Sequence, residues 1–300
     1  SRGRLLMVEE LPDPPVYERA RYTTLPDTMP LVLQHAPDIP YITVLVTHTE
    51  HREEEARGIP EEVEVEFQAG RWPSSSVAPE PSQRRTGPAA DWPRGAGKVA
   101  GELEELAHRN HTETIVLAGP PWARGVLANR IPKHLRDSVT TIPAPEPIQP
   151  DSEALRMSTM GRALLERELS ELFRGRLSAH DRMRVETFLA QRARHGRASE
   201  GLPAVVAALQ RGQAEALLLN TPVELPDHLW AGNEPTEIAL SATELHSFGV
   251  PSFQAAPADA VLIRALVGTG AELIAVPRQD LPLPDGVGVL LRYANPGTQA

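Results

Sequence analysis

The stretch ADAVLIRALVGTGAELIAVPRQDLPLPDGVGVLLRY, residues 258–293, indicates the class of fold. Its first part, residues 258–268, has the apolar spacing of a helix. Residues 271–277 and 287–293 are short apolar runs bounded by Gly and Pro, which is typical of buried strands. We therefore interpret the stretch as a helix followed by two strands of one sheet.

The residues before this stretch repeat its pattern. Residues 202–212 (LPAVVAALQRG) predict a helix, and residues 214–220 (AEALLLN) and 237–241 (EIALS) predict strands. Two successive groups of helix, strand and strand indicate an α/β sandwich. Upstream of it, residues 165–173 and 185–193 have the spacing of amphipathic helices, and we expect these two helices to pack together.

Glycines in the opening stretch have a structural interpretation. Gly268 and Gly270 resemble the start of a dinucleotide-binding fingerprint, but they follow a helix and precede a strand, the reverse of the required order. Gly286 and Gly288 are expected to serve a turn and a close approach between strands. The sequence therefore predicts no nucleotide cofactor here.

The first half of the chain is also a mixture of strands and helices. Residues 41–50 and 61–68 predict a β-hairpin, because Val63, Val65 and Phe67 alternate with polar residues. The patterns that follow are a helix at 97–109, a strand at 113–119 and a helix at 121–131. A second α/β domain is therefore expected before the sandwich.

Proline-rich passages suggest where the domains divide. Residues 4–9 predict a strand and residues 29–35 a helix, and we interpret residues 1–37 as the C-terminal remnant of an N-terminal α/β domain. A stiff, proline-rich connector at 142–150 then separates a middle domain, 38–150, from a C-terminal domain, 151–300.

Composition excludes several classes of function. The 300 residues include no cysteine, which excludes disulfides, thiolate nucleophiles and cysteine-based zinc sites. No apolar run reaches the roughly 18 residues of a membrane span. His48 and His51 have no third ligand in evidence, and a histidine beside a helix end, such as His108 or His111, commonly contacts the last carbonyls. We expect a cytoplasmic protein with no metal, no cofactor and no membrane partner.

Charge is unevenly distributed along the chain. The net charge is -10, and residues 201–300 hold 4 basic and 10 acidic side chains, which argues against a DNA-binding protein. Residues 70–99 are net basic, and we expect residues 70–95 to form a long irregular loop that contacts RNA phosphates. The candidate RNA-binding residues are Arg71, Arg84, Arg85, Arg94 and Lys98.

Several stretches resemble one family. Residues 258–293, residues 201–219, the strand ETIVLAG and the pair Trp72-Pro73 are similar to bacterial relatives of archaeo-eukaryotic release factors and Pelota. The closest group looks like the actinobacterial one that includes Balon-type ribosome hibernation factors. The resemblance spans nearly the whole chain and implies three domains. The middle domain would be RNase H-like, with a long loop reaching the peptidyl transferase centre, and the C-terminal domain a ribosomal-protein-like α/β sandwich.

The resemblance makes Gln83 a candidate catalytic residue. In hydrolytic members, a Gly-Gly-Gln sequence at the loop tip orients water beside the peptidyl-tRNA ester. Here residues 79–83 are Pro-Glu-Pro-Ser-Gln, so the flexible glycines are replaced and two prolines restrict the backbone. Gln83 is therefore either a catalytic residue or a polar residue of an exposed loop.

The resemblance implies a ribosome-binding factor that occupies the tRNA site of idle or stalled ribosomes. Its partners would be rRNA, with tRNA and a translation GTPase as further candidates. The alternatives are a peptidyl-tRNA hydrolase that releases nascent chains through Gln83, and a degenerate paralogue without ribosome affinity. No Asn-Ile-Lys-Ser motif occurs, so stop-codon decoding is not expected.

Overall fold

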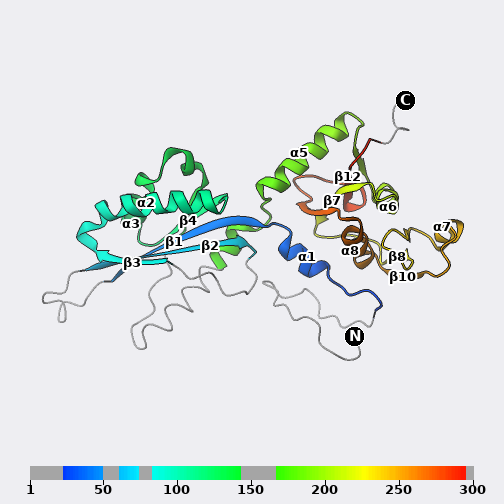
Figure 1. Ribbon diagram of the computed structural model, residues 1–300, viewed down its shortest axis with the longest axis horizontal. Coiled ribbons are helices and arrows are strands. Elements are labelled where there is room, and N and C mark those ends of the chain that lie inside the picture. The colour runs from blue at the N-terminus through cyan, green and yellow to red at the C-terminus, as the bar shows by residue number, and fades with distance from the viewer. Residues whose placement is uncertain (1–22, 50–60, 74–82, 143–166, 295–300) are drawn as a thin grey trace. The chain divides into compact units, whose positions relative to one another are not determined.

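A computed structural model of the chain is shown in Figure 1; it describes residues 23–49, 61–73, 83–142 and 167–294. The predicted strand at residues 4–9 lies outside the described residues. So does the predicted boundary at residue 150.

The chain forms two compact units. The first joins the segment that ends at Pro37 to the residues from Leu177 onward, and the second runs from Asp38 to Arg176. Each unit contains its own sheet and helices. The multidomain α/β class predicted from the sequence is therefore confirmed.

A five-stranded sheet organises the second unit, in the order β3-β2-β1-β4-β5. β2 pairs antiparallel with both β1 and β3, whereas β4 runs parallel to β1 and β5 runs parallel to β4. This order and these directions are those of the RNase H-like sheet expected for the middle domain, and the predicted hairpin is β1 with β2. The strands are β1 (Ile39–Thr49), β2 (Glu62–Trp72), β3 (Gln83–Pro88), β4 (Thr114–Ala118) and β5 (Val139–Ile142).

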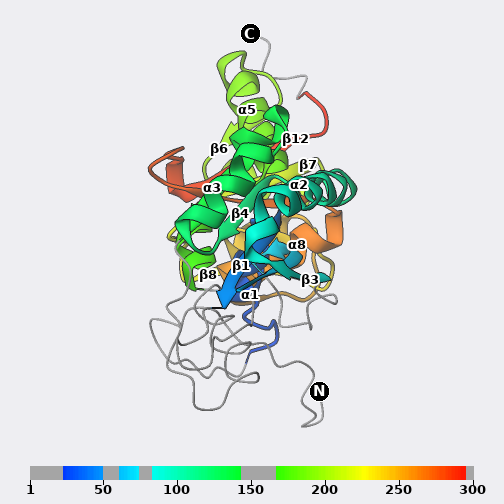
Figure 2. The ribbon, with the colours of Figure 1, turned by 90° about the vertical axis from the view of Figure 1, so that its left-hand side faces the viewer.

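One face of this sheet is covered by two helices, α2 (Trp92–Arg109) and α3 (Pro121–Arg130), which lie on the same side of the strands (Figure 2). Because side chains alternate between the faces of a strand, Val44 and Phe67, which are partners in the register, both point toward these helices. They are buried there together with Leu103 of α2.

Residues 167–173 form a helix on the other face of the sheet, where Phe173 is buried. α5 (Ala179–Ala193) instead places Phe188 in the core of the first unit. The prediction that these two helices pack together is wrong. Gly175, with a positive φ of 70°, follows the first helix, and each helix turns its apolar side chains toward the sheet of its own unit.

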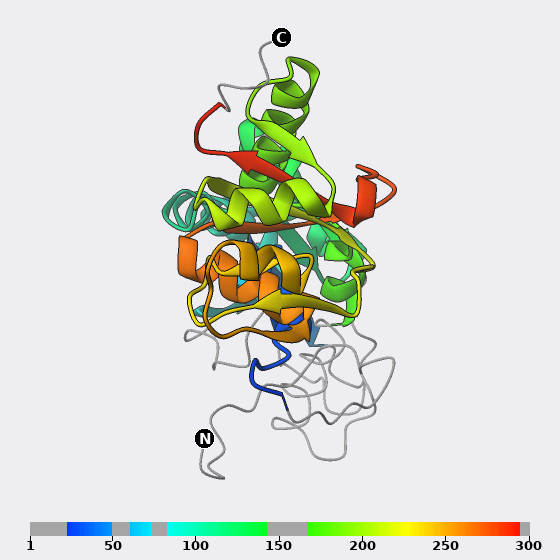
Figure 3. The same ribbon diagram turned by 90° about the vertical axis from the view of Figure 1, so that its right-hand side faces the viewer.

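A four-stranded sheet, in the order β11-β7-β12-β6, organises the first unit. In Figures 1 and 3, α5 lies above this sheet and α8 lies below it. Leu217 and Leu219 face α6 and α8, while Leu218 faces α5. The elements are α1 (Met29–His35), β6 (Ala198–Glu200), α6 (Leu202–Gln210), β7 (Ala214–Thr221), α8 (Ala258–Thr269), β11 (Glu272–Pro277) and β12 (Val287–Leu291).

An insertion between β7 and α8 forms a small sheet, β10-β8-β9, with one short helix. Its elements are β8 (His228–Ala231), β9 (Ile238–Ala239), α7 (Ala242–Ser247) and β10 (Gln254–Pro257). The strand predicted at 237–241 is only two residues long. It ends because the Ser241 hydroxyl accepts a hydrogen bond from the Glu244 amide and begins α7.

The structural interpretation of two glycines is confirmed. Gly286 has a positive φ of 69°, which glycine adopts without strain, at the turn before β12. A Cβ atom on Gly288 would lie 2.9 Å from the Phe188 ring, so only glycine lets α5 pack this closely on the sheet.

Charged hydrogen bonds fasten α5 to the strands beneath it. The Arg184 guanidinium donates to both carboxylate oxygens of Glu272 at 3.0 Å and to Glu215 at 2.5 Å. Burial acts to raise the pKa of Glu272, but hydrogen bonds from Arg184 and His180 outweigh it and hold that pKa below the ordinary value of 4.5. The ionised form of Glu272 is therefore favoured in the folded protein.

Stability of the first unit should consequently fall when Glu272 is protonated. Because the folded-state pKa is depressed, the contribution is present above the unfolded pKa and is lost as the pH falls through the folded value, below about pH 4.5. Since the pair is partly exposed, we expect less than about 1 kcal/mol. Urea unfolding of wild type and Glu272→Gln between pH 3 and 7 would measure it. A difference between the two proteins that does not shrink toward pH 3 would contradict the assignment.

Candidate nucleic-acid interface

The cations predicted to contact RNA lie on regular elements rather than in one loop. The irregular loop expected over 70–95 is interrupted by regular structure, because β2 extends to Trp72, residues 83–88 pair with β2 and α2 begins at Trp92; residues 74–82 lie outside the described residues. Arg71 lies in β2, Arg84 and Arg85 in β3, and Arg94 and Lys98 in α2.

These elements bring some of the cations together and separate another. Arg85 is paired with Val65 in the register of β2, and Arg71 lies six residues farther along that strand. At about 3.3 Å per residue, Arg71 is therefore about 20 Å along β2 from the position opposite Arg85. Arg94 and Lys98 are one helical turn apart and share a stripe of α2 with Glu102.

Arg85 joins β3 to that stripe. Its Nη2 lies 2.7 Å from Oε1 of Glu102, while its side chain is 55% exposed. The second carboxylate oxygen of Glu102 is buried without a hydrogen-bond partner among the described residues. The ion pair thus holds the edge strand to α2 and leaves most of the guanidinium at the surface.

Arg94 and Lys98 are the most available of these cations. Arg94 is 89% exposed and forms an ion pair of 3.2 Å with Asp91, one turn earlier. Lys98 is exposed and forms no ion pair with any residue that the structure describes. Exposed pairs of this kind contribute little energy, so phosphate oxygens can replace the carboxylate at small cost.

Arg71 has a different role. Its guanidinium donates to both carboxylate oxygens of Asp38, with an Nη2 to Oδ2 distance of 2.8 Å. The hydrogen bond that Arg71 donates to Asp38 is the largest contribution that raises the pKa of Arg71. Asp38 precedes β1, so this bidentate pair ties the start of β1 to the end of β2. Arg71 is therefore a structural residue first.

Trp72 fixes the end of β2. Its ring stacks on Phe173 with centroids 5.6 Å apart and an angle of 25° between the planes. The Arg176 guanidinium lies 6.0 Å from the same Phe173 ring. The strand reaches this position because Gly70 has no Cβ, which would lie 2.9 Å from the Tyr41 hydroxyl.

Gln83 is the first residue of β3 and pairs in the register with Phe67 of β2. Residues 79–82, which precede it in the motif, lie outside the described residues. Its backbone belongs to a paired strand, which has less freedom than the glycine-rich tip that a hydrolytic loop requires.

Sequence reasoning missed the carboxylates that pair with the predicted cations. Asp91 could have been found, because it lies three residues before Arg94 at the start of a helix. Asp38 and Glu102 could not, since strand pairing and helix packing bring them to Arg71 and Arg85 from distant parts of the sequence.

His48, one of the two histidines considered as metal ligands, contacts other side chains. Nε2 of His48 lies 3.2 Å from Oε2 of Glu61, and its ring meets Trp122 edge-on at 5.4 Å. His51 lies outside the described residues. Within the described parts of the chain, no three potential ligands gather in a way that could hold a metal. No described helix is both long and apolar enough to cross a membrane.

The sequence model of bacterial archaeo-eukaryotic release factor family 2 matches residues 40–194. No curated protein sequence matches the chain.

Among solved structures, Pelota from Archaeoglobus fulgidus is similar, with a TM-score of 0.43 and 15% identity over 86% of this chain and 65% of that one. Dom34 from S. cerevisiae, a translation termination-like factor, has a TM-score of 0.36 and 11% identity, over 91% of this chain and 68% of that one. A model of ribosome-bound archaeal Pelota and ABCE1 has a TM-score of 0.34 and 11% identity, over 89% of this chain and 94% of that one. The chain thus spans about two thirds of the length of the first two.

Proposed function

We propose, from the premise that this chain belongs to bacterial archaeo-eukaryotic release factor family 2, that it is a translation factor that binds the ribosome. The matched residues run from β1 to the end of α5 and so include the complete five-stranded sheet with its hairpin and α2. This match is the observation on which the proposal depends. A cytoplasmic location accompanies it.

The finer proposal is that the protein occupies the tRNA site of idle or stalled ribosomes, in hibernation or rescue, as the resemblance to the Balon-type group implies. The exposed cations of β3 and α2 support an RNA contact on this side of the second unit. The RNA-facing residues that we propose on this side are Arg85, Arg94 and Lys98, and Arg71 acts by holding the hairpin in place. Arg84 stays a proposal from the sequence alone, as the neighbour of Arg85 in β3. Phosphate contacts of this kind position a protein without reading sequence.

We propose a second binding surface, for a protein partner, on the insertion of the first unit. No Lys or Arg occurs between Arg211 and Arg264, so this sheet and α7 offer nothing to a phosphate backbone. Leu240 and Phe248, at the two ends of α7, are 41% and 60% exposed. Exposed apolar residues in an acidic setting suit a basic protein surface, and a translation GTPase is the class that we propose.

Peptidyl-tRNA hydrolysis through Gln83 stays a separate hypothesis. The paired position of Gln83 does not favour it, because the tip of a hydrolytic loop must enter the peptidyl transferase centre freely. Release of nascent chains from stalled large subunits, compared between wild type and Gln83→Ala, would test the residue directly.

Charge reversal on α2 tests the proposed RNA contact. We expect Arg94→Glu with Lys98→Glu to weaken binding to purified ribosomes at least 10-fold at low salt, because two phosphate contacts become repulsive. We also expect the slope of log affinity against log salt to fall by about 2. Both side chains are exposed, so the variant should remain folded by circular dichroism.

A matched control reverses two other exposed cations of the same unit. Arg130 is the last residue of α3 and Lys133 begins the 3-10 helix that follows, in the connection between β4 and β5, which lie toward the opposite edge of the sheet from β3. Arg130→Glu with Lys133→Glu should bind ribosomes like wild type. Equal losses in the two double variants would indicate a general effect of net charge, and unchanged binding of the α2 variant would remove α2 from the interface.

A further inference from the structure

A second basic surface lies in the first unit, at the end of its sheet where β12 finishes. Three segments meet there: the turn after α5, the turn after α6 and the residues after β12. Arg197 Nη1 donates to the carbonyls of Leu291 and Arg292 at 3.4 and 3.3 Å, and the Leu291 amide donates back to the Arg197 carbonyl at 2.7 Å. These hydrogen bonds hold the first segment to the third.

Arg292 joins the remaining segment. Its guanidinium donates to the carbonyl of Gly212 at 3.1 Å and to those of Thr269 and Gly270 at 2.9 Å. Its amide donates to the carbonyl of Gln213 at 2.9 Å. Arg292 therefore has a structural role, because it holds these segments together. Arg264 has a structural role elsewhere in the unit, since it donates to carbonyls of the insertion.

Two cations on this surface do not hold segments of the chain together. Arg194 and Arg211 follow the last residues of α5 and α6, and both side chains are exposed. Neither forms an ion pair or side-chain hydrogen bond with residues that the structure describes. The nearby carboxylates are already paired, Glu200 with Arg192 at 2.6 Å and Glu215 with Arg184 at 2.5 Å.

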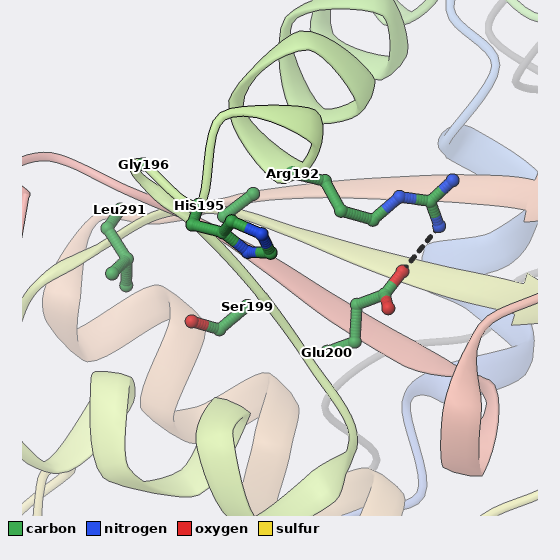
Figure 4. Close-up of a pocket in the computed structure, with 7 residues that line it drawn as sticks. Arg192, His195, Gly196, Ser199, Glu200 and Leu291 are labelled. Atoms are coloured by element: carbon green, nitrogen blue, oxygen red, sulfur yellow. Dashed lines mark hydrogen bonds and ion pairs between the residues drawn. The ribbon is translucent and has the colours of Figure 1, made fainter. Parts of the chain in front are cut away.

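An exposed aromatic ring lies on the third of these segments. Tyr293 directly follows Arg292 and is 70% exposed, although a tyrosine usually buries much of its ring. A hollow of about 260 Å³ opens on the neighbouring side of the α5 turn. Figure 4 shows the His195 ring between Ser199 and the ion pair of Arg192 with Glu200, with Leu291 on the far side.

Free cations on two hydrogen-bonded segments and an exposed aromatic ring on the third are a combination that suits single-stranded RNA, in which cations contact phosphates and a ring stacks on a base. A protein partner would need apolar area, which Arg194, Arg211 and the hollow do not supply. The hollow is smaller than the roughly 300 Å³ of drug-sized pockets and offers an imidazole ring and a carboxylate to the edge of one base.

We infer that this surface, formed by Arg194, Arg211 and Tyr293, binds an unpaired segment of RNA. The inference rests on the proposed function, because ribosomal RNA is the RNA that such a factor meets. It adds a contact in the first unit that is separate from α2 and β3. The charge distribution agrees, since the insertion in the same unit has no Lys or Arg and this end has five Arg residues. These are Arg192, Arg194, Arg197, Arg211 and Arg292.

The first test replaces the ring. Tyr293→Ala should weaken binding to purified ribosomes about 5-fold to 150-fold, the range seen when a stacking aromatic is removed. Tyr293→Phe should bind like wild type, because stacking needs the ring and not the hydroxyl. Met183→Ala, which removes another exposed apolar side chain of the first unit, should also bind like wild type. Ultraviolet cross-linking of the wild-type complex should attach a nucleotide to the peptide that contains Tyr293.

The second test reverses the charges. Arg194→Glu with Arg211→Glu should lower the salt slope of ribosome binding by about 2, independently of the α2 variant. If wild type does not bind ribosomes at all, the proposed function fails. If wild type binds while Tyr293→Ala and the double variant bind equally well, the ribosome contact stands and this inference is overturned.

Discussion

Replacing Phe173 with alanine is expected to lower the free energy of unfolding of the second unit by about 3–5 kcal/mol, the cost of emptying a buried aromatic site. The Phe173 side chain is 1% exposed. Its ring centroid lies 5.6 Å from those of both Tyr41 and Trp72, so the cavity would open between the sheet and the helix at residues 167–173. Urea unfolding followed by tryptophan fluorescence would measure the loss, because Trp72 reports from the cavity wall.

Two variants control for this result. Phe173→Leu keeps most of the buried volume and should cost less than about half as much. Phe248→Ala removes the same ring from a site that is 60% exposed, and surface changes of this kind usually cost within about 0.5 kcal/mol. A Phe173→Ala loss as small as that of Phe248→Ala would show that residues 167–173 are not docked on the sheet in solution.

Periodicity predicted the elements that bury a continuous apolar face. Strand β1, strand β7 and helix α8 are long and regular, and tertiary packing agrees with their local pattern. Of the short elements of the insertion, only β9 was predicted, and it is shorter than expected; β8, α7 and β10 were not predicted, since each has only four to six residues. At that length one turn residue such as Ser241 decides the structure, and apolar spacing has too few positions to show it.

The packing of residues 167–173 shows a second limit. Their apolar spacing predicted a helix, which is confirmed, but not which sheet it would cover. The partner is selected by Gly175, whose positive φ changes the direction of the chain, and by Trp72, which offers a ring for stacking. Neither cue is visible as periodicity.

The sequence predicted which cations belong to the candidate site but not where they lie in the fold. The sequence showed that cations are concentrated between residues 70 and 99. It did not show that Arg71 would be paired with Asp38 at one end of the sheet while Lys98 is exposed on α2, because strand register determines the first position and the packing of α2 on the sheet determines the second. For the same reason it could not bring Tyr293 to Arg211, which lies 82 residues earlier and reaches the same surface through the hydrogen bond from Arg292 to Gly212.

Asn220 is the residue whose polar contacts matter most to the first unit. It lies near the end of β7 and is completely buried. Its Nδ2 donates to the carbonyls of Val276 at 3.3 Å and Leu281 at 2.8 Å, and its Oδ1 accepts from the Leu283 amide at 3.0 Å. One side chain thus satisfies three backbone groups, one in β11 and two in the segment that connects β11 with β12.

Asn220→Leu should therefore cost about 3–5 kcal/mol, although leucine has a similar volume. Each buried backbone group that loses its partner costs about 1–3 kcal/mol, and apolar contacts of leucine recover only part of the sum. The matched control is Asn233→Leu, the same substitution at an exposed position of this unit, which should cost within about 0.5 kcal/mol. Chemical unfolding followed by circular dichroism would compare the two.

Amide hydrogen exchange at Leu283 should also accelerate in Asn220→Leu alone, since that N–H loses its acceptor while the strands on either side remain paired. Equal stability of the two variants would mean that water or another group replaces the Asn220 amide. The connection between β11 and β12, which leads through β12 to Tyr293, would then depend on packing rather than on this hydrogen-bonded side chain.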